Sequence, residues 1–344
     1  LKNGLVLSFI KDKRTYFFLL LLVSIGVGLQ IEIYKVAIIV LLLQWLISAD
    51  FKQKFLKLKQ NYFAVGLMVL YSLYAISFFW SDNKEVAVTD TILKLPLLIL
   101  PLIIVSQKSL SVKQINQVFL SFALSSLLLN LFCLRDAYFS FLKTGLTSEF
   151  YYHHLTINMH TAYQSMFTCF SIVLFVYLFI KEKFISNWIT YSAVIFQTMF
   201  VLLLSSRMQI LIMIVIVPVY LISYHYKKKK TALGLLYTIL IFGFSYLIIT
   251  APSVLNSRYA KTVSQINSIG VDNDNSDPRK FIWAEGLEVI KNHWLIGAGA
   301  GDAKDALVAR YSKLILDNPT ADNLVDSTVF QIQKNKKTVS YLKE

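Results

Sequence analysis

Arginine is the residue type whose placement in this chain points most directly to chemistry. Arg207 follows two serines and lies between two apolar runs, 188–204 and 208–224. A cation between two membrane-length apolar stretches costs free energy unless it lies at an interface or faces a polar cavity with a partner. Because a planar guanidinium can hold two phosphate oxygens at once, this position suits an anionic ligand. The alternative interpretation is an interfacial arginine that extends to water at a hairpin tip.

Two further arginines lie in the last quarter of the chain. Arg279 begins a short polar and aromatic segment that includes Trp283, and Arg258 lies upstream. Arginines from separate loops can converge on a diphosphate and neutralise the charge that develops on a leaving group. The alternative for Arg279 is a solvated loop residue.

Histidine and tyrosine gather before the apolar run at 162–180. Residues 151–154 read Tyr-Tyr-His-His, and His160 and Tyr163 follow. A histidine near a bound hydroxyl nucleophile can take its proton. The alternative is that these are interfacial polar residues without a role in chemistry.

Three alternate glycines precede an aspartate near the C-terminal end: Gly297, Gly299, Gly301 and Asp302. The pattern resembles a phosphate-cradling loop, but that motif requires a strand before it and a helix after it in a βαβ unit. We therefore predict a turn that lets the chain reverse.

Composition sets the class of protein that must position these residues. The chain has 344 residues, of which 56% are hydrophobic. The apolar residues form blocks that approach the ~20 residues needed to cross ~30 Å of hydrocarbon. Only helices satisfy their own backbone groups in lipid without closing a barrel, so we predict an all-α polytopic membrane protein. About nine transmembrane helices are expected, near 16–30, 33–49, 62–79, 92–106, 115–134, 162–180, 188–204, 208–224 and 232–250.

The charge pattern predicts orientation. A net charge of +14 would indicate nucleic acid as the partner of a soluble protein. Here the lysines lie beside membrane segments, so we expect them to set topology and to meet anionic head groups, with no nucleic-acid partner. Loops rich in Lys and Arg alternate with loops that contain fewer of them, including 135–161. Because basic loops favour the cytoplasmic side, this alternation predicts a cytoplasmic N-terminus and places Arg207 outside.

The same alternation divides the chain into two domains. Residues 1–250 are predicted to form the transmembrane domain and residues 251–344 an external, periplasmic region. That region is expected to be partly helical, with apolar spacing at 281–290 and again near 303–316. Cys133 and Cys169 lie in apolar runs and are interpreted as buried thiols. No spacing typical of a metal site is found, and we expect no cofactor.

The stretch 279–302, RKFIWAEGLEVIKNHWLIGAGAGD, resembles the signature of the O-antigen ligase and O-antigen polymerase family. That signature has an arginine, a tryptophan four residues later, a helix and a glycine turn, although Trp294 stands where the family usually has proline. A serine–arginine pair between two spans, at Ser206 and Arg207, also matches. The segment 78–83, FFWSDN, and the motif His-x-x-Tyr-x-Ser at 160–165 resemble its Bacteroidetes-like branch.

The resemblance implies a GT-C-like, all-helical glycosyltransferase of the bacterial cytoplasmic (inner) membrane. Such enzymes serve lipopolysaccharide and polysaccharide biosynthesis. They move a glycan from undecaprenyl diphosphate to an acceptor sugar hydroxyl, as on lipid A-core, without a metal ion. By family role, Arg207 and Arg279 would hold the diphosphate. We expect four further residues to contact the substrates: Arg258, His160, Tyr163 and Trp283.

Other functions remain open at this point. A repeat-unit polymerase shares the donor but extends another lipid-linked or polysaccharide acceptor. A transporter of lipid-linked glycans and an inactive remnant are further alternatives. Family members carry a histidine further along the external region, followed by closing spans. Here no histidine follows His293, so we expect a chain that is truncated or divergent at its C-terminal end, and its general base is unassigned.

Overall fold

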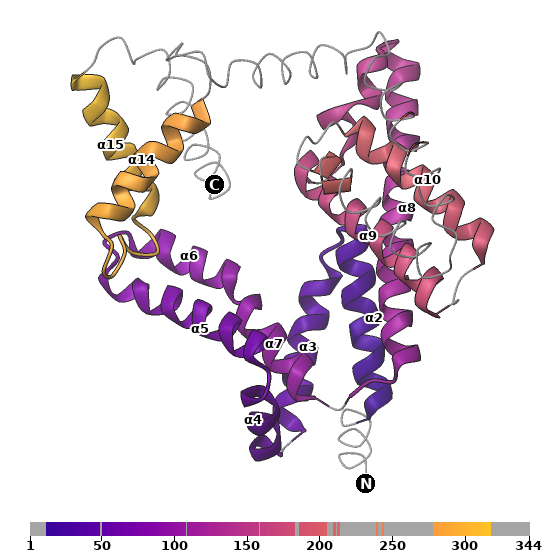
Figure 1. The fold of residues 1–344 in the computed structure, drawn as a ribbon, viewed down its shortest axis with the longest axis horizontal. Coiled ribbons are helices and arrows are strands. Elements are labelled where there is room, and N and C mark those ends of the chain that lie inside the picture. The colour runs from indigo at the N-terminus through magenta and orange to yellow at the C-terminus, as the bar shows by residue number, and fades with distance from the viewer. Residues whose placement is uncertain are drawn as a thin grey trace. The chain divides into compact units, whose positions relative to one another are not determined.

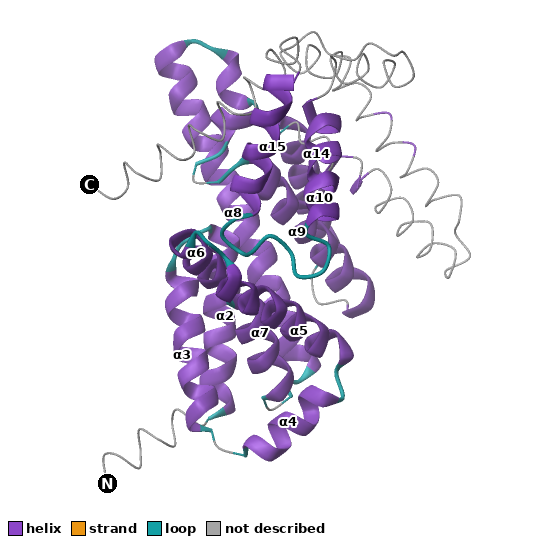
Figure 2. Ribbon diagram, turned by 90° about the vertical axis from the view of Figure 1, so that its left-hand side faces the viewer, coloured by secondary structure: helices purple, strands orange, loops and turns teal. Residues whose placement is uncertain are grey.

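Helix is the regular structure throughout the part of the chain that can be described. The computed structural model describes residues 12–204 apart from 49, 108, 158 and 183–185, a few positions between 209 and 243, and residues 278–317. Within these ranges there are helices and turns but no strand (Figures 1 and 2). Arg207, Arg258 and most of the two predicted spans at 208–224 and 232–250 lie outside the described residues.

The described helices include several of membrane length. Four are long and apolar enough to cross a bilayer: Tyr62–Trp80, Lys84–Ser106, Val112–Thr144 and Thr161–Phe179. They become five if Ile33–Ile47 and Phe51–Lys59 form one span. Over the described residues the protein is therefore helical, and its long apolar helices fit the polytopic membrane protein that the sequence predicts. The count of nine spans and the GT-C-like arrangement stay predictions.

Two compact units make up the chain, each from two stretches of sequence. One unit combines Leu1–Ala49 with Lys108–Thr262, and the other combines Asp50–Gln107 with Val263–Glu344. The second unit therefore joins an early hairpin of helices to the end of the chain. The domain boundary predicted near residue 250 lies outside the described residues and stays a prediction.

The first unit is a bundle of helices that approach closely through small residues. In it, α2 packs against α3 and α8, while α9 packs against α8 and α10 (Figure 1). A Cβ added to Gly28 of α2 would lie 2.6 Å from Ser125 Cβ of α8, and the Ser24 hydroxyl donates to the Val118 carbonyl oxygen at 2.7 Å. In lipid the hydrophobic effect does not drive helices together, and small residues allow the close backbone approach on which their packing depends. The helices are α2 (Lys13–Leu29), α3 (Ile33–Ile47), α8 (Val112–Thr144), α9 (Thr161–Glu182) and α10 (Asn187–Leu203).

Polar side chains tie α8, α9 and α10 together inside this bundle. Asn130 donates to the Thr168 hydroxyl at 3.1 Å and accepts from the Gln164 amide at 3.2 Å. Gln197 of α10 donates to the Ser171 hydroxyl at 2.8 Å. Cys133 and Cys169, the two cysteines of the chain, are buried free thiols, as the sequence predicts.

Helix α8 is longer than its apolar run. The sequence predicts a span that ends at 134 and a loop from 135 onward, but the helix continues to Thr144. Arg135 and Asp136 do not interrupt it, because they pair with each other at 2.8 Å and remain exposed. Its 33 residues extend about 50 Å, so one end projects beyond the hydrocarbon. Two short turns of 3₁₀ helix follow, η2 (Thr147–Phe150) and η3 (Tyr152–Leu155).

The second unit is built on two antiparallel membrane helices. One is α5 (Tyr62–Ile76), continued by η1 (Ser77–Trp80). The other is α6 (Lys84–Lys94) followed at once by α7 (Pro96–Ser106). Basic helix α4 (Phe51–Lys59) packs against α7, and the hairpin of α14 (Pro278–Asn292) and α15 (Ala303–Asp317) belongs to the same unit (Figure 1).

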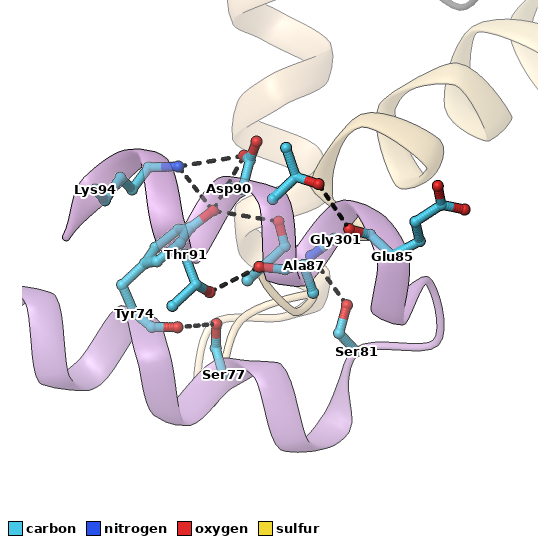
Figure 3. A network of polar contacts seen from close by, with 11 residues as sticks. Tyr74, Ser77, Ser81, Glu85, Ala87, Asp90, Thr91, Lys94 and Gly301 are labelled. Carbon is cyan, nitrogen blue, oxygen red and sulfur yellow. Dashed lines mark hydrogen bonds and ion pairs between the residues drawn. The ribbon is translucent and has the colours of Figure 1, made fainter. Parts of the chain in front are cut away.

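An internal ion pair explains why the span predicted at 92–106 begins earlier, at Lys84. The charges of α6 mask its apolar character in sequence, but Lys94 Nζ lies 3.2 Å from Asp90 Oδ2 and donates to the Tyr74 hydroxyl at 2.8 Å (Figure 3). Charges inside a span are tolerated when they are paired. The α6–α7 segment is therefore a 23-residue helical segment that is long and apolar enough to form one span.

The close approach of α2 and α8 gives a first prediction. In Gly28→Ala the new methyl group meets Ser125 at a distance that requires one helix to shift, at a cost of about 1–3 kcal/mol. The matched control is Gly66→Ala in α5, where no atom lies within 4 Å and helix propensity gains about 0.5–1 kcal/mol. Thermal unfolding in detergent should show a lower midpoint for Gly28→Ala only. An unchanged midpoint there would contradict the packing.

Candidate functional site

Arg279 lies in the first turn of α14, one residue after the helix begins at Pro278. Proline suits a first helical position because its φ is fixed and its missing N–H would have no partner there. The first-turn N–H groups lack acceptors within the helix, and the helix dipole is positive at this end. The backbone around Arg279 therefore favours an anion. On the same helix Trp283 is exposed.

Helices α14 and α15 form a hairpin that is fixed by an ion pair. Arg310 Nε of α15 donates to Glu285 Oε2 of α14 at 2.8 Å, and the Glu285 side chain is only 12% exposed. Helix α14 ends near His293, whose ring nitrogen lies 3.0 Å from the Val289 carbonyl oxygen. The chain reverses there, and Gly297 adopts a φ of 74°.

The turn after α14 is held by a loop more than two hundred residues away in sequence. Residues 81–83 and 299–302 form what we call the Asp302 dock. Asp302 Oδ2 accepts from the Asp82 backbone N–H at 2.7 Å and from the Ser81 hydroxyl at 2.9 Å, and its Oδ1 accepts from the Asn83 backbone N–H at 2.8 Å. The Gly301 N–H donates to Ser81 Oγ at 2.9 Å (Figure 3).

Two helix beginnings meet in the dock. Asn83 caps α6, because its side-chain oxygen accepts from the Val86 N–H at 3.3 Å. The Asp302 carboxylate thus lies at the positive end of α6, while its own backbone oxygen accepts the Ala306 N–H at the start of α15. Asn83 also donates to Asp305 at 3.4 Å. Each segment therefore satisfies polar groups of the other.

The same contacts set the ionisation of Asp302. Its pKa is held below the usual range, first by the Asn83 backbone N–H and then by the Asp82 N–H and the Ser81 hydroxyl, against partial desolvation. The nearby positive charge of Lys84 acts in the same direction. Asp302 therefore carries a negative charge in the docked state at neutral pH.

Glycine is required at two positions of the turn. Gly299 has a φ of 101°, which other residues rarely adopt, and Gly301 packs so closely that a Cβ would clash with the Asn83 carbonyl oxygen and lie 2.9 Å from the Ala87 nitrogen. The Gly301 N–H is already bonded to Ser81. The glycines thus let two backbones approach each other.

The histidine and tyrosine residues lie in the first unit, at the beginning of α9. His160 caps this helix, because its Nδ1 accepts from the Ala162 N–H at 3.2 Å. Its ring lies 5.6 Å from that of His153 and 6.4 Å from that of Tyr163, which is 59% exposed. Tyr152 has a positive φ of 57°, unusual for a bulky residue. The structure thus brings these rings together, and their role in substrate binding stays a prediction.

The sequence indicates the two segments of the dock as motifs but not their pairing. Segment 78–83 and the glycine turn were each notable as motifs, yet no local signal relates positions 220 residues apart. The Glu285–Arg310 pair was also missed, although its members lie on two predicted amphipathic stretches. Among the described residues, no three His, Cys, Asp or Glu side chains are grouped to hold a metal ion.

Comparison with known proteins agrees with the C-terminal motif. The family model for O-antigen ligase matches residues 192–333. This range includes α14, the glycine turn and α15, as well as Arg207 and Arg258. The family resemblance is therefore confirmed over that part of the chain. No curated protein and no solved structure matches.

Gly301→Ala should open the dock. The clash is with backbone atoms and costs about 1–3 kcal/mol, where 1.4 kcal/mol is a tenfold change in the undocked population. We expect trypsin to cleave after Lys304 about tenfold faster or more, as followed by mass spectrometry. Gly286→Ala on α14, with no atom within 4 Å of the new methyl group, is the matched control. Equal cleavage rates would contradict the close approach.

The lowered pKa of Asp302 predicts how the dock responds to acid. A carboxyl whose pKa is lower in the folded state contributes its full stability above its ordinary pKa, about 3.9, and loses it as pH falls through the folded value. Protection of the Asp82 and Asn83 amides from hydrogen exchange should therefore persist to about pH 4 and be lost below. Asp302→Asn should lack this acid dependence. Loss of protection between about pH 5 and 7 would contradict the assignment.

Proposed function

Because residues 192–333 match the O-antigen ligase family, we propose that this protein is a membrane glycosyltransferase of the ligase type. It transfers a glycan from undecaprenyl diphosphate to an acceptor sugar hydroxyl, such as one on lipid A-core. The observation that carries the proposal is the position of Arg279, in the first turn of a helix within the matched range. Backbone and side chain there favour the same ligand, an anion.

The diphosphate is the anion that this position suits. Arg279 and Arg207 would each bring a fork of N–H donors to phosphate oxygens, and the N-terminal amides of α14 would add dipoles. Such groups stabilise charge that is larger in the transition state than in the bound donor. Their contribution therefore falls on the rate of transfer more than on donor binding.

The second unit supports an outward location for this site. The lysine-rich helix α4 precedes α5, and the Asp302 dock begins at Ser81, directly after η1. The 19-residue segment Tyr62–Trp80 between them is about 28 Å long, close to one hydrocarbon thickness. Lysines at one end of a span favour the cytoplasm. We therefore propose that α14 and α15 face the periplasm, with the N-terminus cytoplasmic and the protein in the inner membrane.

The reaction we propose is a direct displacement. The acceptor hydroxyl oxygen attacks the anomeric carbon, and the bond from that carbon to the diphosphate oxygen breaks with its electron pair. Undecaprenyl diphosphate leaves, and the hydroxyl proton passes to a base whose identity stays open. No metal ion is invoked, because the arginines supply the positive charge.

A repeat-unit polymerase is the nearest alternative, since it uses the same donor and differs only in its acceptor. The two activities separate in one assay. Membranes containing the protein receive labelled undecaprenyl-diphosphate glycan with either lipid A-core or a second lipid-linked glycan. Transfer to lipid A-core supports a ligase, whereas chain extension alone replaces that proposal with the polymerase.

Arginine substitutions test the proposed roles. Arg279→Ala and Arg207→Ala should each lower the rate of transfer by about 10²-fold or more, the usual effect of removing a transition-state donor. Arg279→Lys should retain part of the rate, because lysine keeps the charge but loses the fork. Lys291→Ala is the control, because Lys291 lies in the last turn of α14, is itself exposed, and pairs with Glu288 of the same helix. Wild-type transfer by either alanine variant would remove the proposed role.

A further inference from the structure

We propose that Asp302 is a positioning residue. Through the dock it fixes the external hairpin of α14 and α15 on the start of α6 and so sets where Arg279 lies. The effect on glycan transfer rests on the proposed function, whereas the mechanical part of the proposal, that the dock fixes the hairpin, does not. The proposal gives the N-terminal segment 81–83 a part in assembling a site whose family motif lies at the other end of the chain.

The hydrogen bonds that Asp302 accepts in the dock are strong. One carboxylate accepts three hydrogen bonds of 2.7–2.9 Å, two of them from backbone N–H groups at the positive end of α6. Hydrogen bonds to an ionised acceptor are shorter and stronger than neutral ones. The side chain that holds the turn cannot be replaced by a hydrophobic residue of similar size without leaving those donors unpaired.

The receiving side of the dock is itself anchored to the membrane helices. Lys84 Nζ donates to the carbonyl oxygens of Phe78 and Phe79 at 2.9 and 3.0 Å, which closes the loop between η1 and α6. The Tyr74 hydroxyl, next to the Asp90–Lys94 pair, lies 3.3 Å from the Ala300 carbonyl oxygen. Figure 3 shows Tyr74, Asp90 and Lys94 on α5 and α6, with Gly301 of the turn nearby. The turn is therefore positioned against two spans, not against one loop.

The hairpin carries that position to Arg279. Arg279 lies about 20 Å along the axis of α14 from the end that enters the turn. The Glu285–Arg310 pair joins α14 to α15, so the two helices move together. A tilt of roughly 10° at the dock would displace the start of a 20 Å helix by about 3.5 Å. Misplacement by about 1 Å can already cost 10²-fold in rate, so a small loosening is enough to matter.

The rival interpretation is that the dock merely holds the fold together. The two differ in what a mild loosening does. A structural contact lowers the amount of folded protein, whereas a positioning contact lowers kcat of protein that is still folded and inserted. It leaves the KM for the donor nearly unchanged, because the transition state depends on Arg279 more than donor binding does.

The experiment compares four variants of the full chain in nanodiscs. Asp302→Ala removes all three acceptor contacts, and Asp302→Asn keeps the shape but loses the charge. Ser81→Ala removes the hydroxyl that donates to Asp302 and, with it, the acceptor of the Gly301 N–H. Asp82→Ala is the matched control, because Asp82 contributes its backbone N–H and its carboxylate takes no part in the contacts with Asp302. Two measurements are made on monodisperse protein: hydrogen exchange of peptides covering 80–87 and 293–302, and kcat and KM for glycan transfer.

We expect Asp302→Ala to increase exchange in both peptides together and to lower kcat about 10²-fold, with Asp302→Asn and Ser81→Ala intermediate and Asp82→Ala unchanged. Increased exchange with wild-type kcat would overturn the positioning role. Unchanged exchange in Asp302→Ala would overturn the dock itself. If the wild-type chain transfers no glycan while exchange in the two peptides stays linked, the proposed function fails and the mechanical part of the proposal stands.

Discussion

A carboxylate at the beginning of α15, bonded to amide hydrogens at the beginning of α6, is the contact on which the second unit depends. Helix beginnings expose N–H groups without acceptors, and burying them without partners is costly. At the start of α6, Asp302 accepts the Asn83 N–H and the Asn83 side-chain oxygen accepts the Val86 N–H. The Asn83 side chain also donates to Asp305. The glycines at 299 and 301 are the geometric condition, since no side chain fits between the two backbones. Caps, turn and interface are thus one arrangement.

The membrane imposes a different solution in each unit. In the first, small residues allow α2 and α8 to approach, and amide and hydroxyl side chains join α8, α9 and α10. In the second, a charged pair inside α6 is compensated by Tyr74 of α5. Polar groups that are expensive in lipid are retained where they connect helices. The Asp90–Lys94 pair does this next to the turn, so it supports the hairpin of α14 and α15 as well as its own helix.

Much of the fold follows from local sequence, and the candidate site does not. Apolar runs predict α2, α3, α5, α9 and α10 closely, and helical spacing predicts α14 and α15 on either side of the glycine turn. Charged pairs hide the bounds of helices: Lys94 masks an apolar helical segment that begins at Lys84, and Arg135 suggests a loop where α8 continues to Thr144. The pairing of 81–83 with 299–302 cannot be predicted from local sequence, because serine, aspartate and asparagine after an apolar run are equally typical of a solvated loop. Family resemblance identifies Arg207 and Arg279 as candidates but gives no contact for either.

The sequence separation of the dock has a consequence for how the protein is made. Its two segments are 220 residues apart, so the receiving loop leaves the ribosome long before the turn that it binds. At about 5–20 residues per second, the delay is roughly ten to forty seconds. During that time the amides of Asp82 and Asn83 must be hydrated at the membrane surface. The hairpin then binds a loop whose flanking helices are already inserted. The binding of the hairpin, and not the insertion of the early helices, is therefore the step that completes this unit.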